Sequence, residues 1–229
     1  MADNISSSAL FHFTRSMTNL KSILKKGFFP RECHEYTLEA GDRKAASRKR
    51  RPLHAVPMVC LCDLPLSLIH KHMREYGSYG IGLTKEWGLK HGFAPVIYTH
   101  PKAQTHQPVR RLITQAQKRN DKGMANDLAT LTAYTKPWRG PAWRNKKLKP
   151  NVQFYDEREW RYVPPNSSGK HSPLLIHPNF IRYLILPPDE TEDNVLELHE
   201  HLRGIYKSNK DAILVTTTIM TEDCISEDI

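Results

Sequence analysis

The chain has 229 residues, of which 39% are hydrophobic, and carries a formal net charge of +10 at pH 7. This length and composition fit one large domain with a real core, or one domain that carries an insertion. No stretch approaches the roughly 18 consecutive apolar residues of a membrane span, and the first residues lack the basic and apolar regions of a secretory signal. We therefore expect a soluble, cytoplasmic protein without a membrane partner.

The cysteines and histidines do not follow a metal-binding pattern. The four cysteines (Cys33, Cys60, Cys62 and Cys224) are too few for a disulfide framework in a chain of this length. Cys60 and Cys62 share one face of an expected strand, where their sulfurs are awkwardly spaced for a single zinc ion and are better interpreted as buried thiols. Neither a Cys-x-x-Cys pair nor a His-Glu-x-x-His helix is present. We predict no metal site.

Hydrophobic periodicity predicts a mixture of strands and helices. Strands are expected at residues 10–14, 56–63, 79–83, 95–99, 159–163, 181–186 and 212–217. Helices are expected from a Thr18 cap to Gly27, from a Ser67 cap to Gly77, over 84–91, through 124–131, and from 189 to 205. The polar residues 31–55 indicate a long loop. Because strands and helices do not alternate as regular βαβ units, the pattern predicts an α+β fold with mixed or antiparallel sheets.

Residues 102–150 differ from the rest of the chain and predict a basic insertion of helix and loop within a single domain spanning 1–229. Positive charges are interleaved with tryptophans in this segment. Such surfaces attract polyanions and stack nucleic-acid bases. The residues that we assign to nucleic-acid binding are Arg110, Arg111, Lys136, Trp138, Arg139 and Arg144. A simple solvated loop is the alternative, since charge runs often serve solubility.

The strand that begins at Glu159 carries an alternating pattern of charged and aromatic residues. Glu157, Glu159 and Arg161 are expected on one side, opposite Trp160 and Tyr162. If the two aromatic residues are packed, the charged side faces a cleft or solvent. A carboxylate at the start of a strand can stabilise a developing cation, as in glycosyl transfer. The alternative is a solvated edge strand with an ordinary surface ion pair.

Further polar residues are expected near the ends of other strands. They are His12, Thr14, Asp63, Ser67, Tyr76 and Tyr79. Gly80 and Gly82 indicate a close approach by another backbone or a ligand. The sequence lacks a nucleophile elbow, a Walker loop and a complete dinucleotide fingerprint, which excludes the ordinary folds for ATP and NAD.

Several segments resemble known bacterial families. Residues 56–67 (VPMVCLCDLPLS), 76–88 (YGSYGIGLTKEWG), 95–98 (PVIY) and 154–162 (FYDEREWRY) are similar to the AbiGi family of abortive phage infection proteins, and the resemblance runs from about residue 10 to 218. The opening LFHFT at 10–14, followed by 19–30 (NLKSILKKGFFP), resembles the DarT-like ADP-ribosyltransferases more distantly.

The DarT-like resemblance implies an ADP-ribosyltransferase-like fold that takes NAD as substrate. By that resemblance His12 contacts the nicotinamide ribose, Thr14 supports the same loop, and residues 63–67 lie on the adenylate side of a pocket that also includes Tyr76 and Tyr79. Glu159 is implied as the catalytic glutamate, and Glu157 is its rival for that role. No arginine follows the second strand to grip the pyrophosphate; Asp63 stands there instead.

Three functions remain open from the sequence. The first is an antiphage enzyme that transfers ADP-ribose from NAD to RNA or DNA. The second is a non-catalytic antitoxin or partner-binding component of a toxin–antitoxin pair. It would use the same basic face to bind a partner protein, such as a cognate toxin or antitoxin, or a nucleic acid. The third is an NAD glycohydrolase, which needs the same pocket without a nucleic-acid surface.

Overall fold

The computed structural model describes residues 7–36, 53–100, 102–104, 106–144, 147–165, 171–206 and 219–221. The chain forms two compact units, one made of Met1–Phe29, Cys60–Phe93 and Ser172–Ile229, the other of Pro30–Val59 and Ala94–His171. The second unit contains the whole 102–150 segment together with the chain on either side of it. That this segment is an insertion within a single domain stays a prediction.

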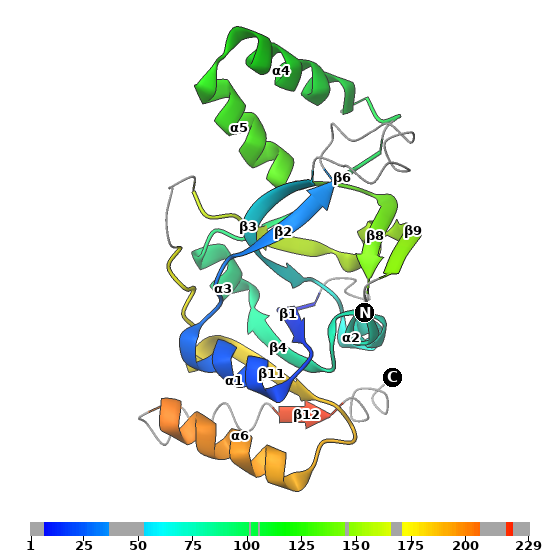
Figure 1. Cartoon of the computed structure of the whole chain (residues 1–229). Coiled ribbons are helices and arrows are strands. Elements are labelled where there is room, and N and C mark those ends of the chain that lie inside the picture. Colours follow the sequence, from blue (N-terminus) through cyan, green and yellow to red (C-terminus); the bar gives the residue numbers. More distant parts are fainter. Residues whose placement is uncertain are drawn as a thin grey trace, which may run out of the picture. The chain divides into compact units, whose positions relative to one another are not determined.

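The first unit is built on a mainly antiparallel sheet (Figure 1). Its elements are β1 (Ala9–Thr14), α1 (Met17–Lys26), η3 (Leu66–Leu68), α2 (Ile69–Tyr76), β4 (Tyr79–Thr84), α3 (Lys85–Lys90), η5 (Pro178–Phe180), β11 (Ile181–Leu186), α6 (Glu192–Ile205) and β12 (Ile219–Thr221). β4 pairs antiparallel with β1 and β11, and β12 pairs with β11 in parallel. The end of β3 (Leu53–Cys62), a strand that both units share, pairs with β1 through Cys62 opposite Phe11.

Aromatic rings on β1 fill the space above two glycines of β4. Gly82 lies opposite Phe11 in the register, and Gly80 lies opposite Phe13. A Cβ atom at Gly82 would lie 2.7 Å from the Phe11 ring and 2.9 Å from that of Tyr183, so these positions have no room for a side chain. Gly80 and Gly82 predicted that a backbone or a ligand would approach β4 closely. The groups that lie against these glycines are instead neighbouring side chains.

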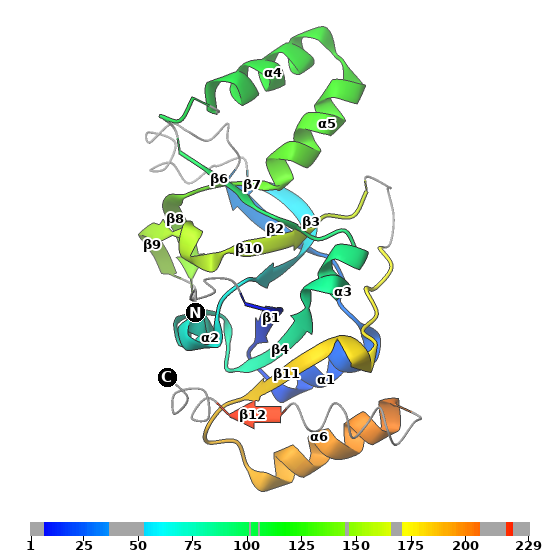
Figure 2. The same ribbon diagram turned by 180° about the vertical axis from the view of Figure 1, so that it is seen from behind.

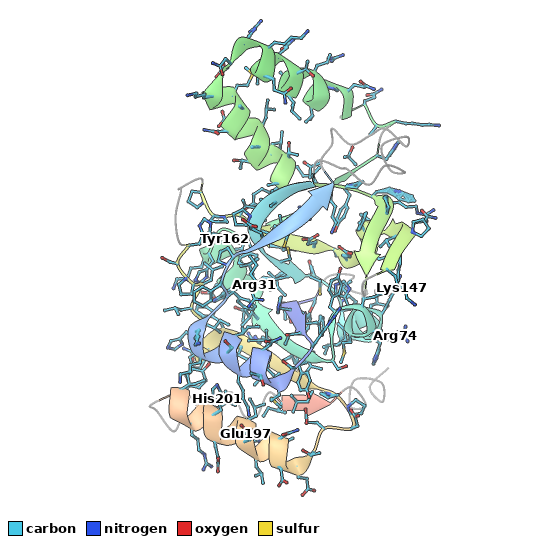
Figure 3. The ribbon with its side chains drawn as sticks, in the orientation of Figure 1. Arg31, Arg74, Lys147, Tyr162, Glu197 and His201 are labelled. Atoms are coloured by element: carbon cyan, nitrogen blue, oxygen red, sulfur yellow. The ribbon has the colours of Figure 1, made fainter. Side chains whose placement is uncertain are left out.

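Helix α1 covers the first unit next to α6. Ser16 caps α1 by accepting a hydrogen bond from the Asn19 amide (3.2 Å), which corrects the prediction of Thr18 as the cap. Lys21 of α1 pairs with Glu197 of α6 (2.8 Å), and the Nε2 atom of His201 hydrogen-bonds the Lys21 carbonyl (2.9 Å). Glu197 and His201 are both labelled on α6 in Figure 3.

The start of α2 differs from the prediction. Ser67 lies in the 3₁₀ turn η3, and the residue that precedes α2 is Leu68, which makes no capping hydrogen bond with its side chain. The 3₁₀ turn takes over the role of a cap because the Leu68 amide bonds the carbonyl of Pro65 (2.9 Å). Helix α2 ends at Gly77, as predicted.

The described part of the second unit contains four strand pairs and a helical hairpin (Figures 1 and 2). Its elements are β2 (Arg31–Tyr36), β5 (Ala94–Pro95), β6 (Ile97–Thr99), α4 (His106–Arg119), α5 (Lys122–Ala133), β7 (Thr135–Pro137), β8 (Arg139–Arg144), β9 (Lys147–Gln153), η4 (Phe154–Glu157) and β10 (Glu159–Tyr162). β2 pairs with β3, β10 with β5 and β8 with β9, all antiparallel, whereas β6 and β7 are parallel. Asp121 caps α5 by accepting from the Met124 amide (3.0 Å).

Two loop predictions fail in this unit. Residues 31–36 and 53–55 belong to the β2–β3 pair, and residues 135–150 form most of three strands instead of a loop. The predicted strand 95–99 is divided into β5 and β6 at Val96, whose amide donates to the Glu159 carbonyl (2.9 Å). The strand predicted at 212–217 lies outside the described residues.

The α+β class with antiparallel pairing is confirmed. Its likeness to ADP-ribosyltransferases stays a prediction. Among the helices in the described ranges, none has the length and apolar character needed to cross a membrane.

Candidate functional site

A cluster of buried charges lies at the start of β10 in the second unit. Lys136 of β7 places its Nζ atom 2.7 Å from Glu157 Oε2 and 2.9 Å from Glu159 Oε2. All three residues are buried, at 6–7% of their possible exposure. One ammonium group therefore pairs with two carboxylates, which belong to η4 and β10.

A second cation completes the coordination of Glu159. Arg161 donates from Nε to Oε1 (2.7 Å) and from Nη2 to Oε2 (3.1 Å), which is the two-pronged geometry that guanidinium groups favour. Its Nη1 atom donates to the carbonyl of Ala133 at the end of α5 (2.7 Å). Arg161 itself is fully buried. Both oxygens of Glu159 are thus engaged by buried cations.

Aromatic side chains surround this cluster, which comprises Lys136, Glu157, Glu159 and Arg161. The Tyr98 hydroxyl accepts a hydrogen bond from the Glu159 amide (2.9 Å). Burial, together with the nearby carboxylates, raises the pKa of Tyr98, so that its hydroxyl stays protonated. Lys136 also lies over the ring of Phe154, with Nζ 4.7 Å from the centroid, in a cation–π contact.

The orientation of β10 reverses one prediction. Glu159 and Arg161 do share a face, opposite Trp160 and Tyr162, as the alternation indicated. The charged face is the buried one, however, and the aromatic residues are partly exposed. The charged side was expected to face a cleft or solvent only if Trp160 and Tyr162 were packed, and this condition is not met. The alternative of a solvated surface ion pair is wrong, because Glu159 and Arg161 are buried. Their burial is tolerated because each charge is paired within hydrogen-bonding distance.

Glu157 does not continue the strand. It ends the 3₁₀ helix η4, and Arg158 follows with a left-handed φ of 43°. This turn brings Glu157 and Glu159 to the same Lys136 ammonium although one residue of irregular backbone lies between them. The two rival candidates for the catalytic role consequently occupy one site.

The other candidate site residues lie in the first unit. The His12 Nδ1 atom is 3.1 Å from the Cys60 carbonyl, and its ring meets that of Phe28 edge-on at 5.0 Å. The buried Asp63 accepts from the Ser7 amide (3.0 Å) and pairs with Lys85 (2.9 Å). Asp63 therefore connects Ser7, which lies just before β1, with Lys85 at the start of α3.

The remaining candidates for NAD contacts are distributed over the same unit. Thr14 and Tyr79 face each other across β1 and β4. Burial and a hydrogen bond with Glu190 raise the pKa of Tyr79 to about 12. The Tyr76 ring lies against that of His72 at 4.7 Å, and Ser67 is exposed in η3. That these residues and His12 share a pocket with Glu159 stays a prediction.

The residues assigned to nucleic-acid binding have different environments. Lys136 belongs to the buried cluster, whereas Arg111 is exposed on α4. Arg139 is exposed and lies over the Trp138 ring, with Cζ 4.7 Å from the centroid. The side chains of Arg110 and Arg144 lie outside the described part of the structure.

Sequence reasoning did not assign Tyr98 or Tyr155 a place near the site, and it offered an ion pair on this strand only as an ordinary surface pair. The two-residue spacing of Glu159 and Arg161 on one strand was a usable signal for an ion pair. For Tyr98 and Tyr155, whose rings meet edge-on at 5.3 Å, the sequence carries no such signal, since they are far apart along the chain. Within the described residues, no three His, Cys, Asp or Glu side chains group as a metal site would.

Comparison with known proteins identifies the class. The family model described as "Putative abortive phage resistance protein AbiGi, antitoxin" matches residues 26–181, which is more than half of the chain. The chain therefore belongs to the AbiGi family of abortive phage resistance proteins, as the sequence motifs indicated.

A curated relative supports the same assignment. The abortive phage resistance protein AbiGi of Lactococcus lactis subsp. cremoris is 28% identical over 151 residues, which cover 57% of this chain and 60% of the relative. The matched region thus spans less than two thirds of that relative. No solved structure matches the chain.

Proposed function

We propose that this chain acts in abortive phage resistance as the antitoxin component, which restrains a toxin protein by binding it. The family description names an antitoxin. The single structural observation that carries the proposal is the saturation of Glu159, whose two carboxylate oxygens contact Arg161 and Lys136 at 2.7–3.1 Å in a buried setting.

The chemistry of glycosyl transfer explains why this saturation matters. A catalytic glutamate must turn a lone pair toward a ribose hydroxyl or a developing oxocarbenium ion. In the cluster two carboxylates face two cations, so the charges largely cancel and little field remains for a substrate. Such an arrangement favours a structural role for the cluster in stabilising the second unit. It therefore supports the proposal that the protein acts by binding a partner and not by catalysis.

Growth of bacteria that express the chain provides the test. Expression of the chain alone should leave growth unchanged. Expression together with the toxin protein of the same abortive-infection system should relieve the growth arrest that this toxin causes alone. The Glu159→Gln variant, once shown to be folded, should relieve the arrest as well as the wild-type chain does. This follows because the proposal gives the Glu159 carboxylate no catalytic role. Arrest by the chain alone would contradict the proposal.

A second candidate function is NAD-dependent transfer of ADP-ribose to a nucleic acid. One observation favours it: Glu157 and Glu159, the two rival candidates for the catalytic role, are brought to a single ammonium at the start of a strand. Purified protein incubated with labelled NAD and either RNA or DNA would show labelled nucleic acid if this candidate is correct. Label in free ADP-ribose would indicate an NAD glycohydrolase instead. Either product should disappear with Glu159→Gln.

A further inference from the structure

The net positive charge of the chain is concentrated in one segment of the second unit. Residues 102–150 contain twelve Lys and Arg residues against two Asp, whereas the remainder of the chain is balanced at 22 of each sign. This segment therefore accounts for the entire net charge of +10. A surface so biased attracts a polyanion irrespective of its sequence.

Two aromatic residues beside this charge are joined by a backbone hydrogen bond. The Tyr155 amide donates to the Trp138 carbonyl (3.3 Å), which fixes the two residues next to each other. Tyr155 is 60% exposed, and Trp138 is partly exposed with Arg139 over its ring at 4.7 Å. Arg139 is held in this position by a hydrogen bond from Nη2 to the side chain of Gln153 (2.9 Å).

The strand β9 adds cations to the same part of the chain. Lys147 and Lys149 are two residues apart, so they share one face of β9, and both are exposed. β9 leads directly into η4, where Tyr155 lies. Figure 3 labels Lys147 on the β8–β9 pair. A strand with basic residues on one face thus leads along the chain to the exposed Tyr155, whose amide bonds the carbonyl of the partly exposed Trp138.

We propose that these five residues, Trp138, Arg139, Lys147, Lys149 and Tyr155, form a surface that binds single-stranded nucleic acid. The lysines contact the phosphate backbone, and Tyr155 and the Trp138–Arg139 pair stack on bases. A single strand fits better than a duplex because the bases of a duplex are stacked on one another and do not offer their faces to exposed rings. The surface adjoins the buried cluster through the contact between Tyr155 and Tyr98 but uses none of the charges of that cluster. The proposal does not depend on toxin binding.

Fluorescence anisotropy with labelled oligonucleotides tests the surface. The probes are oligo(dT) and oligo(U) of about 20 nucleotides, longer than the roughly 4–16 nucleotides that single-strand sites occupy, and a duplex of equal length. Wild-type protein should bind a single strand more tightly than the duplex. The DNA and RNA probes distinguish which kind of strand is preferred.

Two variants separate stacking from charge. Tyr155→Ala should weaken single-strand binding by about five-fold or more, the loss of one stacked base, and leave the salt dependence unchanged. Tyr155→Phe should restore affinity because it keeps the ring. The double variant Lys147→Ala/Lys149→Ala should reduce the slope of log K against log salt by about 1.4, since about 0.7 counterions are released for each phosphate contact on a single strand.

A charge-matched control uses Lys25→Ala/Lys26→Ala, which removes two exposed lysines at the end of α1 in the first unit. This control should bind as the wild type does. The inference is overturned if the control loses as much affinity as Lys147→Ala/Lys149→Ala, if Tyr155→Ala binds like wild type, if the duplex is preferred, or if no probe binds at low salt. Circular dichroism of each variant confirms that the fold is kept before affinities are compared.

Discussion

Lys136 offers the sharpest test of the buried cluster, because one atom serves two carboxylates. We consider Lys136→Met, which keeps an unbranched apolar side chain of similar size but removes the ammonium group and with it the cation–π contact to Phe154. The ion pairs of 2.7 Å to Glu157 and 2.9 Å to Glu159 are both lost. Glu159 keeps its contacts with Arg161, whereas the 2.7 Å pair of Glu157 is broken.

The expected cost follows from the burial of the groups. At an effective dielectric constant of about 20, opposite charges roughly 3 Å apart attract by about 5 kcal/mol. Part of this attraction offsets the desolvation of the groups, and breaking one buried pair typically destabilises a protein by about 3–5 kcal/mol. We therefore expect Lys136→Met to lower the free energy of unfolding of the second unit by about 4 kcal/mol.

Urea unfolding followed by tryptophan fluorescence measures this change, because the tryptophans at 138, 143 and 160 all belong to the second unit. Lys118→Met, at an exposed position near the end of α4, is the matched control and should change stability by no more than about 0.5 kcal/mol. The double variant Lys136→Met/Glu157→Gln should recover at least about 1 kcal/mol, since it removes a negative charge with the positive one. If Lys136→Met proves as mild as Lys118→Met, the cluster does not hold the unit together.

Three further predictions concern the first unit. Ser16→Ala should destabilise by about 1 kcal/mol in thermal or urea unfolding, because it removes the side-chain cap of α1. Gly27→Ala should be more harmful, since φ is +79° and a Cβ atom would lie 2.3 Å from the Leu174 carbonyl oxygen; equal stability to wild type would contradict that geometry. Burial alone would raise the pKa of Glu190, but hydrogen bonds, led by that from Tyr79, lower it below its ordinary 4.5. The ionised carboxylate therefore stabilises the fold above pH 4.5. Wild type should be more stable than Glu190→Gln at pH 7, and this difference in the free energy of unfolding should vanish as the pH falls through the lowered pKa. Unfolding curves recorded across acid pH measure the difference.

The elements of the first unit could be predicted from sequence because their signals are local. The apolar alternation of residues 10–14 and 181–186 and the glycines after α1 and α2 appear in the structure within a residue or two of their predicted positions. The strands that were missed, such as β2 (RECHEY) and β9 (KLKPNVQ), are polar and lack alternation. They become strands through pairing with β3 and β8, and such tertiary context is not visible in a short window of sequence.

The site shows the same division between local and distant information. The shared face of Glu159 and Arg161 follows from a two-residue spacing, so it could be predicted. That this face is buried depends on Lys136, which lies 23 residues before Glu159 and reaches it only through the pairing of β7 with β6. Within a basic segment Lys136 resembles any other cation, and its sequence context therefore indicated a nucleic-acid surface instead of an ion pair.

The stability of the cluster bears directly on function. Catalytic groups are commonly held in arrangements that reduce stability, so that replacing them often stabilises the fold. Binding proteins have no such requirement, and their buried charges are satisfied internally. Both oxygens of Glu159 contact cations, on Lys136 and Arg161, which agrees with the proposed binding role. A loss of stability on breaking the Lys136 pairs, with NAD turnover absent, would assign the carboxylates to the architecture that supports a binding surface. A gain of stability on replacing Glu159, with turnover present, would assign them to chemistry.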